Sequence, residues 1–174
     1  LSDREQVYTL DGVALTDQVN LDYPGYTFMG ETSRALGASV VFSAENGQLP
    51  KLYDVNGDGA VDMTDVQVLL DGVNGLEELS ETVRRDLDLS GDGILDTADV
   101  QILFEKVSAG FTALDVVKVP ANGTATVHVT VTLTDADKAY MDEYYENGIY
   151  VDGFVRLYAQ SEDGVDLSLP FMGF

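Results

Sequence analysis

Two twelve-residue segments carry oxygen-bearing side chains at the same five positions. Residues 54–65 and 88–99 share the pattern D-x-[N/S]-G-D-G-x-x-D-x-x-D, with a glycine at position 6 where the chain must turn sharply. Oxygens at positions 1, 3, 5, 9 and 12 are the ligands that Ca²⁺ prefers in a loop of this length. They come from Asp54, Asn56, Asp58, Asp62 and Asp65, and from Asp88, Ser90, Asp92, Asp96 and Asp99. Because the pattern occurs twice, offset by 34 residues, we expect the chain to bind two calcium ions.

The similarity of the two segments extends into the residues that follow them. Apolar residues recur there with the spacing i, i+3, i+4, i+7, which places them on one face of a helix. They are Val66, Leu69, Leu70 and Val73 after the first segment, and Val100, Leu103, Phe104 and Val107 after the second. We therefore expect a helix that begins at the last aspartate of each segment and ends near Gly75 or Gly110. Residues 76–85 are predicted to form a helix that connects the two.

Outside residues 44–110 the apolar period changes to two. Apolar residues alternate with Thr and His over 124–134, which predicts a half-buried strand. Further strands are predicted at 6–10, 26–29, 38–43, 116–119, 150–158 and 165–174, and a helix at 135–146. About seven strands suit a β-sandwich. The expected fold is therefore mostly β. One sandwich comprises residues 1–43 and 111–174, with residues 40–43 and 111–117 as adjacent strands, and an all-α insertion at 44–110 interrupts it.

The paired segments, each ending in Asp and each followed by one helix, resemble a type I dockerin over about residues 52–110. Dockerins are calcium-dependent modules that attach enzymes to cohesin domains on a scaffold protein or cell surface. The resemblance implies two Ca²⁺ held by the side chains given above, and it adds the backbone carbonyls of Ala60 and Ile94. It also implies partner-binding positions at Met63, Thr64 and Leu70 in the first repeat, and at Thr97, Ala98 and Phe104 in the second.

The flanking residues resemble a second family. Segments 2–10 and 119–127, and above all 146–157 and 169–174, are similar to the fibronectin type III-like domain of cell-envelope subtilisin-like proteases of the lactocepin type. The resemblance covers most of residues 1–43 and 111–174. It implies a fibronectin type III-like β-sandwich that adjoins the serine protease domain of a parent chain. The catalytic residues of that parent would lie upstream of Leu1.

Composition limits the partners and the compartment. The chain has 9 Lys and Arg against 31 Asp and Glu, a formal net charge of −22, so it lacks the clustered cations that bind nucleic acid. It has no apolar run long enough to span a membrane and no cysteine. We expect a bacterial protein that is secreted or attached to the cell surface and that uses metal ions in place of disulfides. A start without Met and an end within an apolar stretch indicate a piece of a longer protein.

Catalysis by these residues is not expected. The single histidine, His128, lies within a predicted strand and has no nucleophile partner. Three functions stay open: calcium-dependent docking to a cohesin-type partner, a calcium-stapled structural spacer, and an adhesin or carbohydrate-binding module. The third would use tyrosines at 140, 144, 145, 150 and 158, for which core packing or contact with a neighbouring domain is the competing interpretation. Leu70-Asp71 and Phe104-Glu105 stand where dockerins often carry Lys or Arg, which keeps the first two functions about even.

Overall fold

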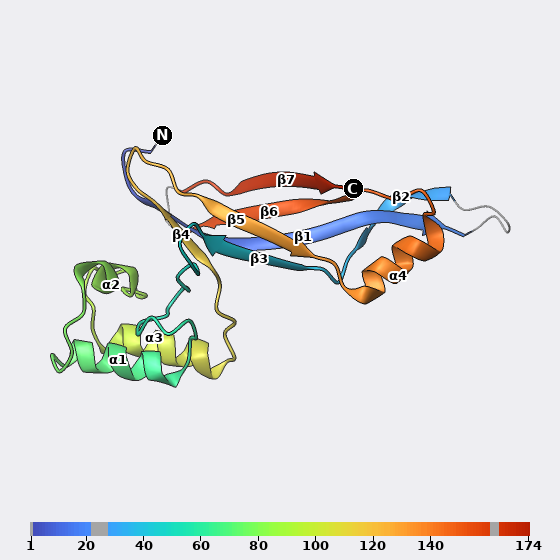
Figure 1. Cartoon of the computed structure of the whole chain (residues 1–174). Coiled ribbons are helices and arrows are strands. Elements are labelled where there is room, and N and C mark those ends of the chain that lie inside the picture. The colour runs from blue at the N-terminus through green and yellow to red at the C-terminus, as the bar shows by residue number, and fades with distance from the viewer. Residues whose placement is uncertain (1, 22–27, 161–163) are drawn as a thin grey trace. The chain divides into compact units, whose positions relative to one another are not determined.

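The computed structural model of the chain describes residues 2–21, 28–160 and 164–174 (Figure 1). They belong to two compact units, one made of residues 1–49 and 117–174 and the other of residues 50–116. We call these the sheet unit and the helical unit and describe each by itself. Residues 44–49, which the sequence analysis placed in the insertion, belong to the sheet unit, and residues 111–116 belong to the helical unit.

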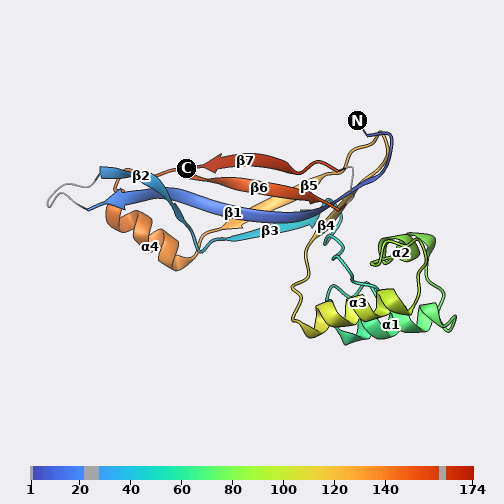
Figure 2. The same cartoon turned by 180° about the vertical axis from the view of Figure 1, so that it is seen from behind.

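Antiparallel strands form two sheets (Figures 1 and 2). The strands are β1 (Gln6–Asn20), β2 (Phe28–Ala35), β3 (Ser39–Ala44), β4 (Val116–Val119), β5 (Val127–Thr132), β6 (Val151–Ala159) and β7 (Leu167–Gly173). The larger sheet has the order β2-β1-β6-β7, and β4 also pairs with β1. The smaller sheet consists of β3 and β5. The chain is therefore mostly β with antiparallel sheets, as its sequence predicts.

Apolar side chains from the two sheets form the core of the sheet unit. Leu10 of β1, Phe42 of β3 and Val155 of β6 belong to one buried cluster, and each is at most 8% exposed. Full burial of side chains of this kind contributes about 1.5–3 kcal/mol each. The sheets lie close together at Gly12, where an added Cβ atom would lie 2.4 Å from Val40 Cγ1. A glycine is required there because any side chain would push β3 away from β1.

Strand β1 is much longer than the predicted segment 6–10. The inner face of its second half carries the small residues Gly12 and Ala14, so the apolar alternation that predicts a strand fades there. Pairing holds this half in place instead, because Leu15 lies opposite Ala35 of β2 and Asp152 of β6. Long-range pairing of this kind is invisible in a local pattern.

The remaining strands differ less from expectation. Strand β4 has its predicted bounds, and β3, β6 and β7 begin or end one or two residues away from theirs. Strand β5 is shorter than 124–134 and more exposed than predicted, because Val129 on its apolar face is itself 40% exposed. The expectation that residues 40–43 and 111–117 form adjacent strands is wrong, since β3 pairs with β5 and β4 pairs with β1. The predicted strand 26–29 lies partly outside the described residues.

Helix α4 (Asp135–Tyr144) ends two residues before its predicted end. Thr134 caps its N-terminus and forms a capping box with Asp137. The buried Asp137 carboxylate also accepts a hydrogen bond from Gly37 N at 2.9 Å. Burial opposes ionisation of this carboxyl, but the hydrogen bonds from Thr134 and Gly37 outweigh it and lower the pKa of Asp137.

The helical unit contains α1 (Met63–Val73), α2 (Glu81–Asp86) and α3 (Thr97–Ser108). Its core consists of Val66, Leu69, Leu79, Leu87, Val100 and Leu103. Helices α1 and α3 begin two residues earlier than predicted, because the aspartate at position 9 of each loop is the N-cap. Helix α2 is shorter than predicted, because Ser80 caps it and residues 76–80 precede it. Gly75 and Gly110 follow α1 and α3 with φ of +72° and +79°, which confirms them as helix stops. No helix among the described residues is long and apolar enough to cross a membrane.

Candidate metal centre

The first aspartate of each loop gathers the N–H groups of its own turn. We call residues 54–65 loop 1 and residues 88–99 loop 2. Asp54 Oδ1 accepts a hydrogen bond from Gly57 N at 2.7 Å, and Oδ2 accepts one from Gly59 N at 2.9 Å. Asp88 accepts from the corresponding positions 4 and 6 of loop 2 at 2.9 and 2.8 Å. The glycines at these positions have φ between +74° and +88° in both loops, a conformation that glycine adopts without strain.

The last aspartate of each loop is fully buried. Asp65 and Asp99 have 0% exposure. Asp65 accepts from Val55 N and Asp62 N at 2.8 Å each, and Asp99 accepts from positions 3 and 9 of its loop at 2.9 and 2.8 Å. Burial opposes ionisation of Asp99, but these hydrogen bonds outweigh it and lower its pKa. Neither carboxylate forms a salt bridge within the described part of the chain. Two negative charges are thus buried with backbone dipoles as their compensation.

The side chains at positions 3, 5 and 9 of each loop also accept hydrogen bonds from backbone N–H groups. In loop 1, Asn56 accepts from Asp58 N at 2.9 Å, Asp58 accepts from Ala60 N at 2.8 Å, and Asp62 accepts from Thr64 N at 2.7 Å. The bond from Thr64 lowers the pKa of Asp62. In loop 2 the corresponding oxygens, those of Ser90, Asp92 and Asp96, accept from Asp92 N, Ile94 N and Ala98 N at 3.4, 2.8 and 2.7 Å. In both loops, the side chains at positions 1, 3, 5 and 9 therefore bond the backbone that follows them, and the side chain at position 12 bonds the backbone that precedes it.

The predicted ligands lie on two compact turns, but their carboxylates do not converge. Among the residues that the structure describes, no three His, Cys, Asp or Glu side chains form a group that could hold a metal ion as placed. The chemistry of the donors nevertheless fits Ca²⁺, a hard cation that takes oxygen ligands. Each loop offers four carboxylates, and the one at position 12 is buried without a cation beside it. The side-chain ligands and the carbonyls of Ala60 and Ile94 stay a prediction.

The ends of the helical unit are fastened to each other beside loop 1. Lys51 Nζ forms a salt bridge of 2.7 Å with Asp115 Oδ1, and both side chains are about a quarter exposed or less. Tyr53, which directly precedes loop 1, has its ring centroid 5.2 Å from that of Phe111. Lys106 Nζ lies 5.3 Å from the Tyr53 centroid, within the range of a cation–π contact. We call these contacts the clasp. They connect the start of loop 1 to the end of α3.

Most of the predicted partner-binding positions are open to solvent. Met63 is 49% exposed and Phe104 is 41% exposed. Thr64, Thr97 and Ala98 are also exposed. Leu70 differs, because it is half-buried and packs against the core of the helical unit. The two repeats therefore present unequal surfaces, with an aromatic ring in the second where the first contributes a core-packed leucine.

The tyrosines have structural contacts that their sequence positions do not reveal. Tyr140 is 8% exposed, and its hydroxyl accepts from Val19 N at 2.7 Å and donates to Asp17 O at 3.1 Å. The Tyr145 hydroxyl donates to the same Asp17 carbonyl at 3.1 Å. Burial together with the neighbouring Tyr140 raises the pKa of Tyr145 to about 12. These two tyrosines fasten α4 and the residue after it to β1.

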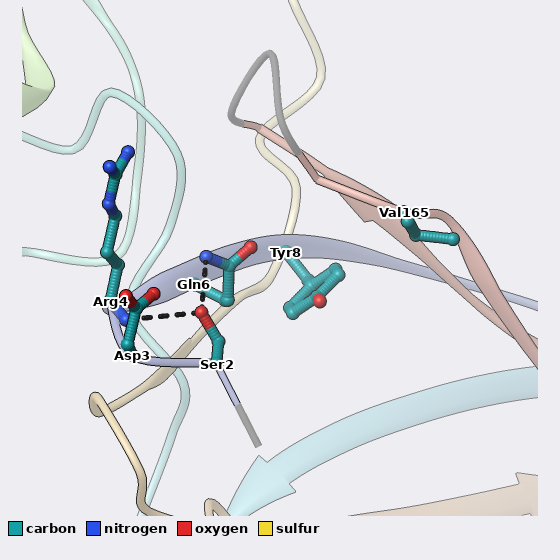
Figure 3. A pocket seen from close by; sticks show the side chains of 6 residues that line it. All are labelled: Ser2, Asp3, Arg4, Gln6, Tyr8 and Val165. Carbon is teal, nitrogen blue, oxygen red and sulfur yellow. Dashed lines mark hydrogen bonds between the residues drawn. The ribbon is translucent and has the colours of Figure 1, made fainter.

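A hollow of about 390 Å³ lies at the start of β1 and is the cavity that Figure 3 shows. Its lining residues are Ser2, Asp3, Arg4, Gln6, Tyr8 and Val165. Ser2 Oγ accepts hydrogen bonds from Arg4 N and Gln6 Nε2, both at 3.2 Å (Figure 3). Polar groups that bond one another on an exposed segment do not define a binding site. His128, exposed on β5, is not among the lining residues.

Comparison with known families finds one match. The model of the Fn3-like domain matches residues 77–172, which is more than half of the chain. The chain belongs to the Fn3-like domain family. The match includes strands β4 to β7, and also α2, loop 2 and α3 of the helical unit. It does not extend to residues 1–43, where the sequence resemblance also placed this domain. No curated protein and no solved structure matches the chain.

Proposed function

We propose that the helical unit of this Fn3-like protein is a dockerin-like module that binds two Ca²⁺, one in each loop. The observation that carries the proposal is the pair of buried carboxylates at position 12, Asp65 and Asp99. Backbone N–H groups compensate these two carboxylates, but no positive charge lies beside them in the described part of the chain, and a metal ion would supply one. The same twelve-residue arrangement of N–H groups around position 1 in both loops supports this assignment.

The metal would act as a structural element. Side chains at positions 1, 3, 5, 9 and 12, with the carbonyls of Ala60 and Ile94, would hold the ions, and each ion would offset the mutual repulsion of four carboxylates. Its binding energy would add to the folding energy of the helical unit. In the absence of calcium, the residues of the unit itself hold the loops through the hydrogen bonds and the clasp described above.

For the role of the module, we propose calcium-dependent docking to a cohesin-type protein. Met63 and Phe104 are exposed, and methionine and aromatic side chains are enriched in protein interfaces. Thr64, Thr97 and Ala98 are exposed as well. The parent protein would be a secreted or surface-attached bacterial subtilisin-like protease, and this chain would be a non-catalytic accessory region of it. The proposal for the parent rests on the sequence resemblance of residues 146–157 and 169–174.

The clasp supports a second candidate function, a calcium-stapled spacer without a cohesin partner. Lys51 and Asp115 fasten the two ends of the helical unit to each other. A rigid insert of this kind would stabilise the chain whether or not a partner binds. Docking requires the exposed side chains of the helical unit to contact a partner protein, whereas the spacer function does not.

Surface plasmon resonance with a panel of cohesin domains, in Ca²⁺ and in EDTA, separates the two. Docking predicts binding in Ca²⁺ that EDTA abolishes and that Phe104→Ala with Met63→Ala weakens at least tenfold. A matched control is Leu76→Ala, because Leu76 is 77% exposed in the same unit but lies outside the predicted partner positions. A lack of binding, together with a melting temperature that rises in Ca²⁺, would favour the spacer instead.

A further inference from the structure

The smaller sheet has two strands, so β3 and β5 each have one side that no described strand covers. Strand β5 pairs with β3 along one side, and in the described part of the chain nothing pairs with its other side. Such a side leaves unpaired N–H and C=O groups, which form a template for another strand. Folded proteins usually block exposed edges with a proline, a charged side chain or a bulge.

Strand β7, the edge of the larger sheet, has such a block and β5 does not. Pro170 lies within β7 opposite Phe154 and has no N–H to offer to a neighbouring strand. Residues 121–134 contain no proline and no Asp, Glu, Lys or Arg, although charged residues make up 23% of the chain. On the inner face of β5, Val129 lies opposite Phe42 and is still 40% exposed. An unblocked edge with an incompletely covered valine is typical of a strand that has a partner.

The sequence of β5 is complementary to itself. Around Val129, the residues 124–134 read Thr-Ala-Thr-Val-His-Val-Thr-Val-Thr-Leu-Thr, so the apolar and polar pattern is the same in both directions. Antiparallel pairing centred on Val129 would place Val127 opposite Val131 of the other copy and His128 opposite Thr130. Every apolar residue would then face an apolar one on the inner side, and Thr or His would face Thr or His outside. Directly opposed pairs of these kinds stabilise antiparallel strands.

We propose that two copies of this chain associate through antiparallel pairing of β5 with β5, centred on Val129. The pairing is isologous and produces a four-stranded sheet in the order β3-β5-β5-β3. It satisfies the free side of β5 and buries Val129 against its own copy. The net charge of −22 on each copy opposes association over long distances, but residues 121–134 contain no Asp, Glu, Lys or Arg, so salt screens the repulsion without breaking ion pairs in the contact. The dimer should therefore tighten as ionic strength rises.

Sedimentation equilibrium of the full chain at 0.05 and 0.5 M NaCl tests the proposal. We expect a mass that rises from 18.8 kDa towards twice that value with protein concentration, and at lower concentration in the higher salt. The double variant His128→Glu/Thr130→Glu places Glu opposite Glu twice in this register, and should weaken the dimer at least about tenfold. Both side chains are exposed, so circular dichroism should show an unchanged fold.

Two further variants make the register and the edge decisive. His128→Lys/Thr130→Lys should form a mixed dimer with the Glu variant, because opposite charges then face each other in the proposed register. Ser39→Glu/Val41→Glu, on the outer face of β3, is the matched control and should dimerise like the parent chain. A monomer at all concentrations up to about 1 mM would overturn the proposal, at a Kd too weak to matter. The proposal would also be overturned if only the Ser39→Glu/Val41→Glu variant failed to dimerise. It would be overturned as well if the Glu and Lys variants of β5 did not form a mixed dimer.

Discussion

Replacing Asp99 by alanine tests whether the buried carboxylate of loop 2 stabilises the helical unit in the absence of metal. The Asp99 carboxylate is fully buried and accepts N–H bonds at 2.9 and 2.8 Å from Ser90 and Asp96. A hydrogen bond to a charged group contributes about 1.5–3 kcal/mol, and a buried N–H left without a partner costs about 1–3 kcal/mol. Alanine also removes the cost of burying a charged group, which offsets part of the lost hydrogen-bond energy. We expect Asp99→Ala to lower the free energy of unfolding of the calcium-free helical unit by about 3 kcal/mol.

Asp92→Ala is the matched control. Asp92 belongs to the same loop and carries the same charge, but it is exposed and accepts one bond, from Ile94 N at 2.8 Å. Its replacement should cost less than about 1 kcal/mol without calcium. Urea unfolding of both variants in EDTA, followed by circular dichroism at 222 nm, measures the difference. If Asp92→Ala costs as much as Asp99→Ala, the buried carboxylate does not have the structural role assigned to it.

Three other perturbations follow from the same contacts. The pKa of Asp99 is lowered below 3.8 in the folded chain, so its contribution to stability is complete above that pH and disappears as the pH falls through the lower folded value. Acid unfolding of the metal-free chain should therefore begin below about pH 4. In Asp99→Ala the free energy of unfolding should fall less steeply with pH. Phe111→Ala removes the ring beside Tyr53 and should destabilise the helical unit by about 1–2 kcal/mol, measured by urea unfolding, with no change in the β-sheet signal. Gly12→Ala forces β3 off β1 and should cost about 1–3 kcal/mol, whereas Gly173→Ala, where an added Cβ atom meets nothing within 4 Å, should be nearly neutral in thermal unfolding.

The sequence predicts the parts of this fold that repeat or alternate, and misses the parts that long-range pairing creates. The loop pattern and the apolar residues spaced i, i+3, i+4, i+7 predict α1 and α3 closely. The predicted starts are two residues too late, because Asp62 and Asp96 cap the helices from within the loops. The length of β1 could not be predicted, since Gly12 and Ala14 are small for a reason that lies in β3, far along the chain.

The candidate site divides in the same way. The predicted ligand positions follow from spacing alone. The burial of Asp65 and Asp99, in the first turns of α1 and α3, does not, because the start of each loop folds back to bond these carboxylates. The contact of Tyr53 with Phe111 joins residues that no local pattern connects. Exposure of the partner positions likewise depends on which helix face the core takes, and Leu70 lies on the core side.

Equilibrium dialysis of the metal-free chain against radioactive calcium tests the central claim most directly. The account predicts saturable uptake of two calcium ions per chain, one in the Asp88→Asn variant, and none when Asp54→Asn is added, because position 1 is a predicted ligand in each loop. Each variant keeps the shape of its side chain but replaces one of two acceptor oxygens by an NH2 donor, so circular dichroism of the metal-free variants is the control for folding. Absence of saturable uptake by the parent chain at millimolar calcium would contradict the two-calcium module, and uptake that is unchanged in the double variant would place the ions elsewhere.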